Sequence, residues 1–170
     1  MNSWKKIVWP AVLIGVFLII LFILAKPAEK GAAPAGSNAL TASLINLTAP
    51  EKSFDFGSIS MAAGKVSHSF KIKNSGAEPI NISKIYTSCM CTTASLMTVE
   101  GQTPFFGMPG HGFAPKINRL IKAGEEAIIE VIFDPAAHGP AGVGPISRAV
   151  YLESGEETPF EIGFSAVVIP

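Results

Sequence analysis

The sequence predicts an all-β fold: an immunoglobulin-like β-sandwich of about seven strands, preceded by one N-terminal transmembrane helix and a flexible linker. From about residue 50 onward, short segments alternate apolar and polar residues, and Gly, Pro and Asn signal turns between them. No segment of similar length beyond residue 26 shows helical periodicity. Strands with one apolar face bury that face against a second sheet, which gives a sandwich. The expected domains are an anchor (1–26), a linker (27–48) and the sandwich (49–170).

An uncharged apolar run predicts the membrane helix. Ile7–Ala25 contains nineteen residues without a charge, and lysines flank it at both ends. About twenty apolar residues suffice for a helix to cross a bilayer. The apolar core of a cleaved signal peptide is shorter, about 7–15 residues, and Ala25 precedes Lys26-Pro27, a sequence unfavourable for cleavage. We therefore expect an uncleaved signal-anchor.

The charges near this run predict the orientation. Lys5, Lys6 and the terminal amine place the short N-terminal tail in the cytoplasm. The expected location is the bacterial cell membrane, crossed once, with the β domain periplasmic or at the cell surface. Disulfides are permitted in that compartment. Residues 27–48 are rich in Ala, Pro and Gly, as in flexible linkers, although Leu44–Leu47 is either the end of the linker or a first short strand.

The strands follow from alternation and from turn residues. One example is the segment in which Val66, His68, Phe70 and Ile72 share a face. Gly57 is expected to close the strand before it, and Asp134-Pro135 to stop a later one, because proline cannot continue a ladder. The expected strands are 54–56, 66–73, 79–86, 127–133, 148–152 and 160–168.

Charge and motif content argue against several functions. The net charge is zero, with +3 over residues 1–30 and −3 over the remainder. No basic stripe is present to neutralise phosphates, so no nucleic-acid partner is expected. The sequence has no phosphate loop followed by Lys, no nucleophile elbow and no His-Glu-x-x-His. We therefore expect a protein that is not an enzyme.

The only two cysteines, Cys89 and Cys91, are one residue apart. On an extended segment both sulfurs point to the same face. They can chelate a soft metal, exchange electrons or simply pack as small apolar side chains. A disulfide between them would span Cα atoms about 6.5–7 Å apart in a strand, at the edge of the allowed geometry, and would be labile. The one-residue spacing and the absence of a βαβ pattern exclude a thioredoxin-like site.

A glycine-rich segment at residues 107–112 adds two further soft or imidazole donors, Met108 and His111. Thiolate, thioether and imidazole ligands suit Cu(I) best and Zn²⁺ next. The candidate metal ligands are therefore Cys89, Cys91, Met108 and His111. A third histidine, His138, lies in a Gly/Pro-rich loop, where it is expected to face solvent.

Several motifs together resemble an uncharacterised bacterial family, domain of unknown function 1573. They are Phe54–Gly57, Phe70–Gly76, Ser88–Thr92, Val131–Pro135 and Val150–Leu152. The resemblance covers about residues 50–168. It implies a Hydin-like or major-sperm-protein-like immunoglobulin fold, often exported, without an established activity. Met90 stands where that family commonly has glycine, and residues 95–120 look like an insertion.

Two functions remain open at this level. The first is a membrane-tethered extracytoplasmic domain of non-enzymatic binding or scaffolding type, whose partners are the membrane and another envelope protein. The second is a copper- or zinc-binding or thiol redox protein that uses the Cys89-Met90-Cys91 motif. Whether the cysteines bind metal, exchange electrons or only pack is undecided from the sequence.

Overall fold

The structure is a computed structural model that describes residues 43–110, 116–155 and 157–170. All of them belong to the second of two compact units, Ala39–Pro170. The predicted membrane helix, most of the predicted linker and His111 lie outside the described residues. No helix within the described ranges is long and apolar enough to cross a membrane.

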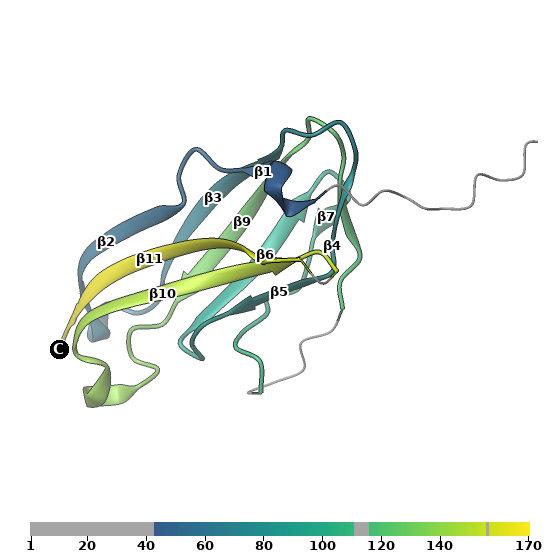
Figure 1. The fold of residues 1–170 in the computed structure, drawn as a ribbon. Coiled ribbons are helices and arrows are strands. Elements are labelled where there is room, and N and C mark those ends of the chain that lie inside the picture. The colour runs from purple at the N-terminus through teal and green to yellow at the C-terminus, as the bar shows by residue number, and fades with distance from the viewer. Residues whose placement is uncertain (1–42, 111–115, 156) are drawn as a thin grey trace, which may run out of the picture. The chain divides into compact units, whose positions relative to one another are not determined.

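The described residues form an all-β sandwich of eleven strands with three short 3₁₀ turns, more strands than expected (Figure 1). Their bounds are η1 Leu44–Asn46, β1 Leu47–Thr48, β2 Ser53–Ser60, η2 Met61–Ala63, β3 Val66–Asn74, β4 Ile80–Ile82, β5 Lys84–Thr87, β6 Thr92–Thr98, β7 Gly101–Gln102, β8 Arg119–Ile121, β9 Glu126–Phe133, η3 Gly139–Gly142, β10 Gly144–Glu153 and β11 Phe160–Ile169.

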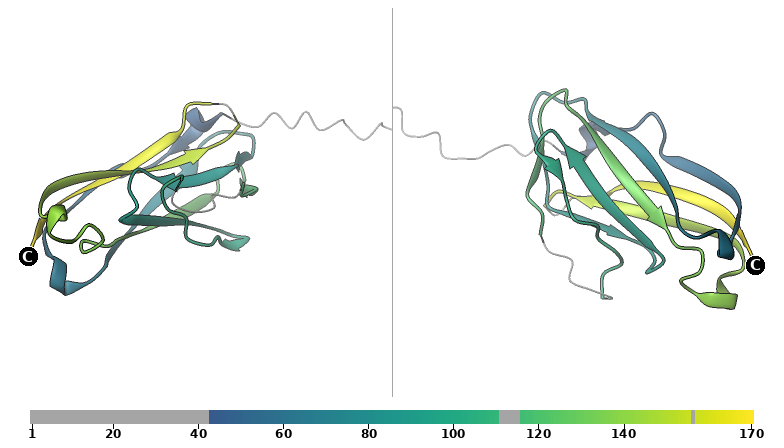
Figure 2. Two further views of the ribbon diagram at one scale, coloured as in Figure 1. Left: turned by 90° about the horizontal axis from the view of Figure 1, so that it is seen from below. Right: turned by 180° about the vertical axis from the view of Figure 1, so that it is seen from behind.

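The strands form two facing layers, seen from two further sides in Figure 2. A five-stranded sheet has the order β1-β3-β9-β6-β7, a four-stranded sheet the order β2-β11-β10-β5, and β4 pairs with β8. The β2–β11 pair is parallel, whereas the other named pairs are antiparallel. The expected single strand over 79–86 is in fact two strands, because Ile80–Ile82 pairs with β8 and Lys84–Thr87 pairs with β10.

The alternation predicted from the sequence builds the core. Phe70 and Ile72 of β3 are buried while the lysines beside them are exposed. Phe133 of β9 packs against Phe164 of β11, with ring centroids 5.3 Å apart, and so joins the two sheets. Burying these faces removes apolar surface from water, which stabilises the fold by about 25 cal/mol for each Å² of apolar surface buried. The expected strands over 127–133, 148–152 and 160–168 are confirmed within β9, β10 and β11.

Two strand boundaries differ from expectation. Leu44 and Leu47 are buried, and β1 pairs with β3, so residues 44–48 are the first elements of the sandwich and not the end of the linker. Gly57 does not close β2. It takes a positive φ of 68° inside the strand, where the register with β11 shifts. Glycine tolerates that backbone conformation at a bulge, so the strand continues.

The expected insertion over residues 95–120 begins within β6, a central strand of the five-stranded sheet. Residues 95–98 therefore belong to the sandwich itself. β7 is the edge strand of the same sheet, so the chain leaves that sheet only after β7, on the way to β8.

A buried asparagine ties β3 to its neighbours. Asn74 has no exposed surface, and its Nδ2 donates to the carbonyls of Glu78 (2.8 Å) and Ile121 (2.9 Å). Its Oδ1 accepts from the N–H of Gly76 (3.0 Å). The side chain thus satisfies three backbone groups, two in the turn that follows β3 and one at the end of β8.

Candidate functional site

The two cysteines lie in the turn between β5 and β6, where the chain crosses from the four-stranded to the five-stranded sheet. They form a disulfide, with their Cα atoms 5.3 Å apart. The expected separation of about 6.5–7 Å assumed an extended strand. That assumption is wrong, because the N–H of Thr92 donates to the carbonyl of Cys89 (3.1 Å) and bends the segment into a tight turn.

Hydrogen bonds hold this turn to both flanking segments. The hydroxyl of Thr87 donates to the carbonyls of Cys89 (2.9 Å) and Thr92 (3.0 Å). On one side, the N–H of Ser88 donates to the carbonyl of Ala149 in β10 (2.9 Å). On the other side, the N–H of Asp134 donates to the carbonyl of Cys91 (2.9 Å). The disulfide is therefore carried by a backbone fixed to both layers.

The loop after β9 brings an imidazole to the first sulfur. Nε2 of His138 lies 3.1 Å from Sγ of Cys89. The loop turns back at Asp134, whose Oδ1 accepts from the N–H of Ala136 (3.0 Å). A Cβ at Gly142 would lie 3.2 Å from Cβ of His138, so glycine there leaves room for the histidine. His138 is exposed, as expected, but it also belongs to the site.

A guanidinium reaches the second sulfur from β10. Nε of Arg148 donates to Sγ of Cys91 over 3.3 Å, and the hydroxyl of Thr92 lies 3.6 Å from the same sulfur. Arg148 occupies an inward-facing position of its strand, in step with the buried Val150 and Leu152. The side chain is itself only partly buried, and its guanidinium lies beside the cysteine turn at the edge of the core.

The two sulfurs have different surroundings. Cys89 is half-buried next to an exposed histidine, whereas Cys91 is 3% exposed next to an arginine. A thiolate at Cys91 would receive a charge-assisted hydrogen bond from the guanidinium. A reagent from solvent reaches Cys89 first. The disulfide thus has an accessible sulfur and a buried one that is suited to leave as a thiolate.

The structure brings part of the predicted ligand set together. Cys89 and Cys91 are together, and their sulfurs and Nε2 of His138 all lie within 4.8 Å of one another. Met108 is half-buried, and the carbonyl of Gly107 before it accepts from the N–H of Thr87 (3.2 Å), so this segment passes beside the turn. A ligand role for Met108 or His111 stays a prediction.

Sequence reasoning missed His138 and Arg148 as site residues. Arg148 could have been found from the sequence, because it alternates with Ile146 and Val150 on the buried face of a strand. A charged side chain on such a face requires a polar partner. His138 carries no such signal, because a loop contact across 49 residues has no local pattern.

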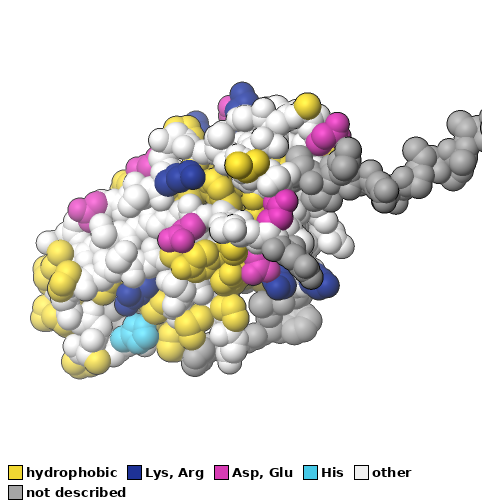
Figure 3. Space-filling model, in the orientation of Figure 1, with side chains coloured by type: hydrophobic (Ala, Val, Ile, Leu, Met, Phe, Trp, Pro, Cys, Tyr) yellow, Lys and Arg dark blue, Asp and Glu magenta, His cyan; other side chains and the backbone are white. Residues whose placement is uncertain are grey.

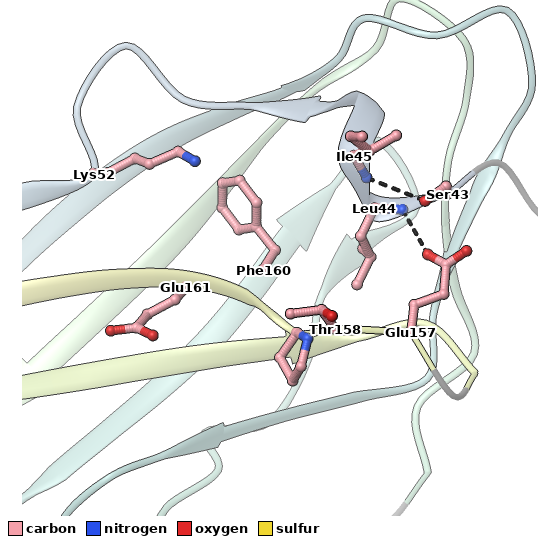
Figure 4. Close-up of a pocket in the computed structure, with 9 residues that line it drawn as sticks. Ser43, Leu44, Ile45, Lys52, Glu157, Thr158, Phe160 and Glu161 are labelled. Atoms are coloured by element: carbon pink, nitrogen blue, oxygen red, sulfur yellow. Dashed lines mark hydrogen bonds between the residues drawn. The ribbon is translucent and has the colours of Figure 1, made fainter.

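Apart from the cysteine turn, a hollow of about 710 Å³ lies where η1 meets the start of β11 (Figure 4). Oε2 of Glu157 accepts there from the N–H of Leu44 (2.8 Å), and Nζ of Lys52 lies 4.8 Å from the ring centroid of Phe160. These contacts fasten the beginning of the sandwich. On the face shown in Figure 3, acidic and basic side chains alternate with apolar ones and no broad area carries one sign of charge.

Residues 47–101 match a family described as protein of unknown function (DUF1573), which confirms the resemblance over that part. No curated protein matches the chain. A crystal structure of a protein of unknown function from Porphyromonas gingivalis W83 is similar, with 15% identity and a TM-score of 0.51, over 76% of this chain and 51% of that one. This chain thus spans about half of that protein, and the similarity concerns the fold.

Two further structures are more distant. The secreted serine protease VesC from Vibrio cholerae has 12% identity and a TM-score of 0.46, over 72% of this chain and 23% of that one. The CooA pilin subunit from enterotoxigenic Escherichia coli has 12% identity and a TM-score of 0.40, over 74% and 98%.

Proposed function

We propose that this chain, whose residues 47–101 match a family without an assigned activity, is a thiol–disulfide exchange protein that passes two electrons to or from a partner protein. One observation carries the proposal: the disulfide has a half-buried sulfur beside an imidazole and a buried sulfur beside a guanidinium. A purely structural disulfide needs neither neighbour. A ring that spans one intervening residue also adds little to stability, since the stabilisation grows with the length of the closed loop.

The first step is attack of a partner thiolate on the accessible Sγ of Cys89. The bond between the partner sulfur and Cys89 forms, and the bond between the two cysteines breaks. The electron pair leaves with Cys91, whose thiolate accepts the hydrogen bond of Arg148 over 3.3 Å. Stabilising the leaving thiolate accelerates exchange, since a better leaving group departs faster.

The second step releases the partner. Its second thiolate attacks the partner sulfur of the mixed disulfide, and Cys89 leaves as a thiolate next to His138, whose Nε2 is 3.1 Å away and can supply a proton. The partner is then a disulfide, and this chain holds a Cys89 thiol and a Cys91 thiolate beside Arg148. Two electrons have moved from the two partner thiolates to this chain, the proton on Cys89 comes from the imidazole, and the reverse sequence oxidises the chain again.

In this role the chain is a stoichiometric carrier and not a catalyst of substrate turnover. The partner is another envelope protein with two neighbouring thiols. The sandwich, of immunoglobulin-like type, stands on the outer side of the bacterial membrane and is tethered by residues 1–26. The uncharged run Ile7–Ala25 and its flanking lysines support the tether, and thiol exchange suits an oxidising compartment.

Trapping of a mixed disulfide tests the proposal. In full-length Cys91→Ser the remaining Cys89 is accessible, so it should react rapidly with an aromatic disulfide reagent and form a stable adduct detectable by mass. Cys89→Ser is the matched variant, whose buried Cys91 should react at least about tenfold more slowly, because reaction requires a local opening of about 1.4 kcal/mol or more. Equal rates in the two variants would refute the asymmetry on which the mechanism depends.

The role of His138 is tested separately. His138→Gln in the wild-type cysteine background should slow reduction by a small dithiol about a hundredfold, the lower end of the usual contribution of proton transfer, while the final thiol count remains two. An unchanged rate would remove the imidazole from the mechanism.

A further inference from the structure

We infer that the reduced chain binds one Cu(I) ion through Cys89, Cys91 and His138. The three donor atoms lie within 4.8 Å of one another, and no other Cys, His, Asp or Glu of the described ranges joins the group. The ligand set differs from the expected one, because His138 supplies the imidazole. The inference rests on the proposed function in one respect only: the disulfide must open by reduction.

The geometry requires only small movements. With metal–ligand distances of about 2.0–2.3 Å, donors around a three-coordinate ion are about 3.5–4 Å apart. Nε2 of His138 is already 3.1 Å from Sγ of Cys89. Once the sulfur–sulfur bond is broken, the two thiolates repel each other and separate toward that distance. Side-chain rotation provides the change, since hydrogen bonds of Thr87, Ser88 and Asp134 fix the turn itself.

The donor set selects the metal. Two thiolates and an imidazole are soft and borderline ligands, which suit Cu(I) and Zn²⁺. Structural Zn²⁺ is almost always four-coordinate, whereas three soft donors satisfy Cu(I). A Cu(I) ion with two thiolates and a neutral imidazole carries a net charge of −1. The guanidinium of Arg148, which already donates to Cys91, neutralises it.

Binding of the metal and formation of the disulfide exclude each other. Cu(I) occupies both thiolates, so the metal-bound dithiol cannot attack a partner. Oxidation of the pair by a partner disulfide therefore begins with dissociation of Cu(I), which leaves without a change of its own charge; the freed thiolates then join each other, and the partner takes up the two electrons as two thiolates. The site therefore releases its ion when it gives up electrons.

A competition titration tests this inference on the full-length chain. The protein is reduced under anaerobic conditions, its thiols are counted, and Cu(I) is titrated in the presence of bicinchoninate, whose coloured Cu(I) complex reports the free ion. We expect one equivalent of Cu(I) to be withheld by the reduced chain and none by the oxidised chain. Zn²⁺ in a parallel titration should bind more weakly.

Substitutions assign the ligands. His138→Ala should weaken Cu(I) binding at least tenfold, with the thiol count still at two. His68→Gln, which removes an imidazole elsewhere, should leave Cu(I) binding unchanged. Binding by His138→Ala equal to that of the wild type overturns the ligand set, and tenfold weaker binding by Met108→Leu would show that the site includes the thioether. Two thiols without Cu(I) binding overturn this inference alone, whereas a thiol count of zero after reduction overturns the proposed exchange function as well.

Discussion

Replacing Arg148 with methionine should make the disulfide harder to reduce. The guanidinium donates through Nε to Sγ of Cys91 over 3.3 Å. In the disulfide that sulfur is a weak acceptor, but in the reduced state it is a thiolate and the hydrogen bond becomes charge-assisted. Arg148 therefore stabilises the reduced state more than the oxidised state. Methionine keeps most of the aliphatic stem and removes the donor.

The magnitude follows from the burial of the pair. A hydrogen bond to a charged group contributes about 1.5–3 kcal/mol, and the lower end applies here because Arg148 is only partly buried. For a two-electron couple, about 1.4 kcal/mol corresponds to roughly 30 mV. The midpoint potential of Arg148→Met should accordingly fall by about 30 mV, with the disulfide favoured about tenfold.

Equilibration in dithiothreitol or glutathione buffers of graded potential, followed by maleimide trapping and mass measurement, gives the midpoint. Arg148→Lys should lie between the two proteins, because an ammonium retains charge but not the planar donor. Arg119→Met removes an equal charge from β8, where Nη1 of Arg119 lies 3.7 Å from Oε2 of Glu100. This control variant should leave the midpoint potential unchanged. A midpoint of Arg148→Met equal to or above that of the wild type would refute the assigned role.

Three predictions concern stability. Leu96→Ala, at a core position without exposed surface, should lower the free energy of unfolding by about 2–5 kcal/mol in urea titrations; a loss below about 1 kcal/mol contradicts the packing. Asn74→Ala leaves three backbone groups without partners and should cost about 3 kcal/mol. Asn81 has a buried Oδ1 without a partner among the described residues, so Asn81→Ala should lower the free energy of unfolding by less. Equal losses in the two variants would show that the hydrogen bonds of Asn74 contribute nothing. The hydrogen bond from Lys84 lowers the pKa of Glu153, although burial opposes it. This stabilisation is present above the pKa of the unfolded carboxyl and is lost as the pH falls through the lower folded value. Lys84→Met should therefore lower the free energy of unfolding, measured in urea titrations, by under about 1 kcal/mol near neutral pH and not at low pH; an equal reduction at both pH values contradicts it.

Much of the fold could be predicted because one buried face per strand leaves a period of two in the sequence. The alternation in Val66–Asn74 and Phe160–Ile169 identifies β3 and β11 almost to the residue. The pairing between strands is not local, however. Nothing in Ile80–Thr87 signals that its two halves pair with β8 and β10, because both halves alternate correctly for either partner.

The site could be predicted only where its residues are neighbours in sequence. Cys89 and Cys91 are recognisable from the sequence because they are its only cysteines and lie one residue apart. The extended conformation assumed for them was wrong, since the turn depends on a hydrogen bond from Thr92. His138 reaches the turn through the conformation of a loop 49 residues away. Such a contact is fixed by tertiary packing and leaves no periodic trace.

The disulfide encloses only Met90, in a turn whose backbone is held by hydrogen bonds to both sheets. By the entropy of loop closure, opening so small a ring removes about 1.6 kcal/mol of stability, a minor part of a typical total. The oxidised and reduced chains therefore present nearly the same surface. A partner that distinguishes the oxidised from the reduced chain must therefore contact the sulfur atoms directly, so recognition and reaction occur in the same step.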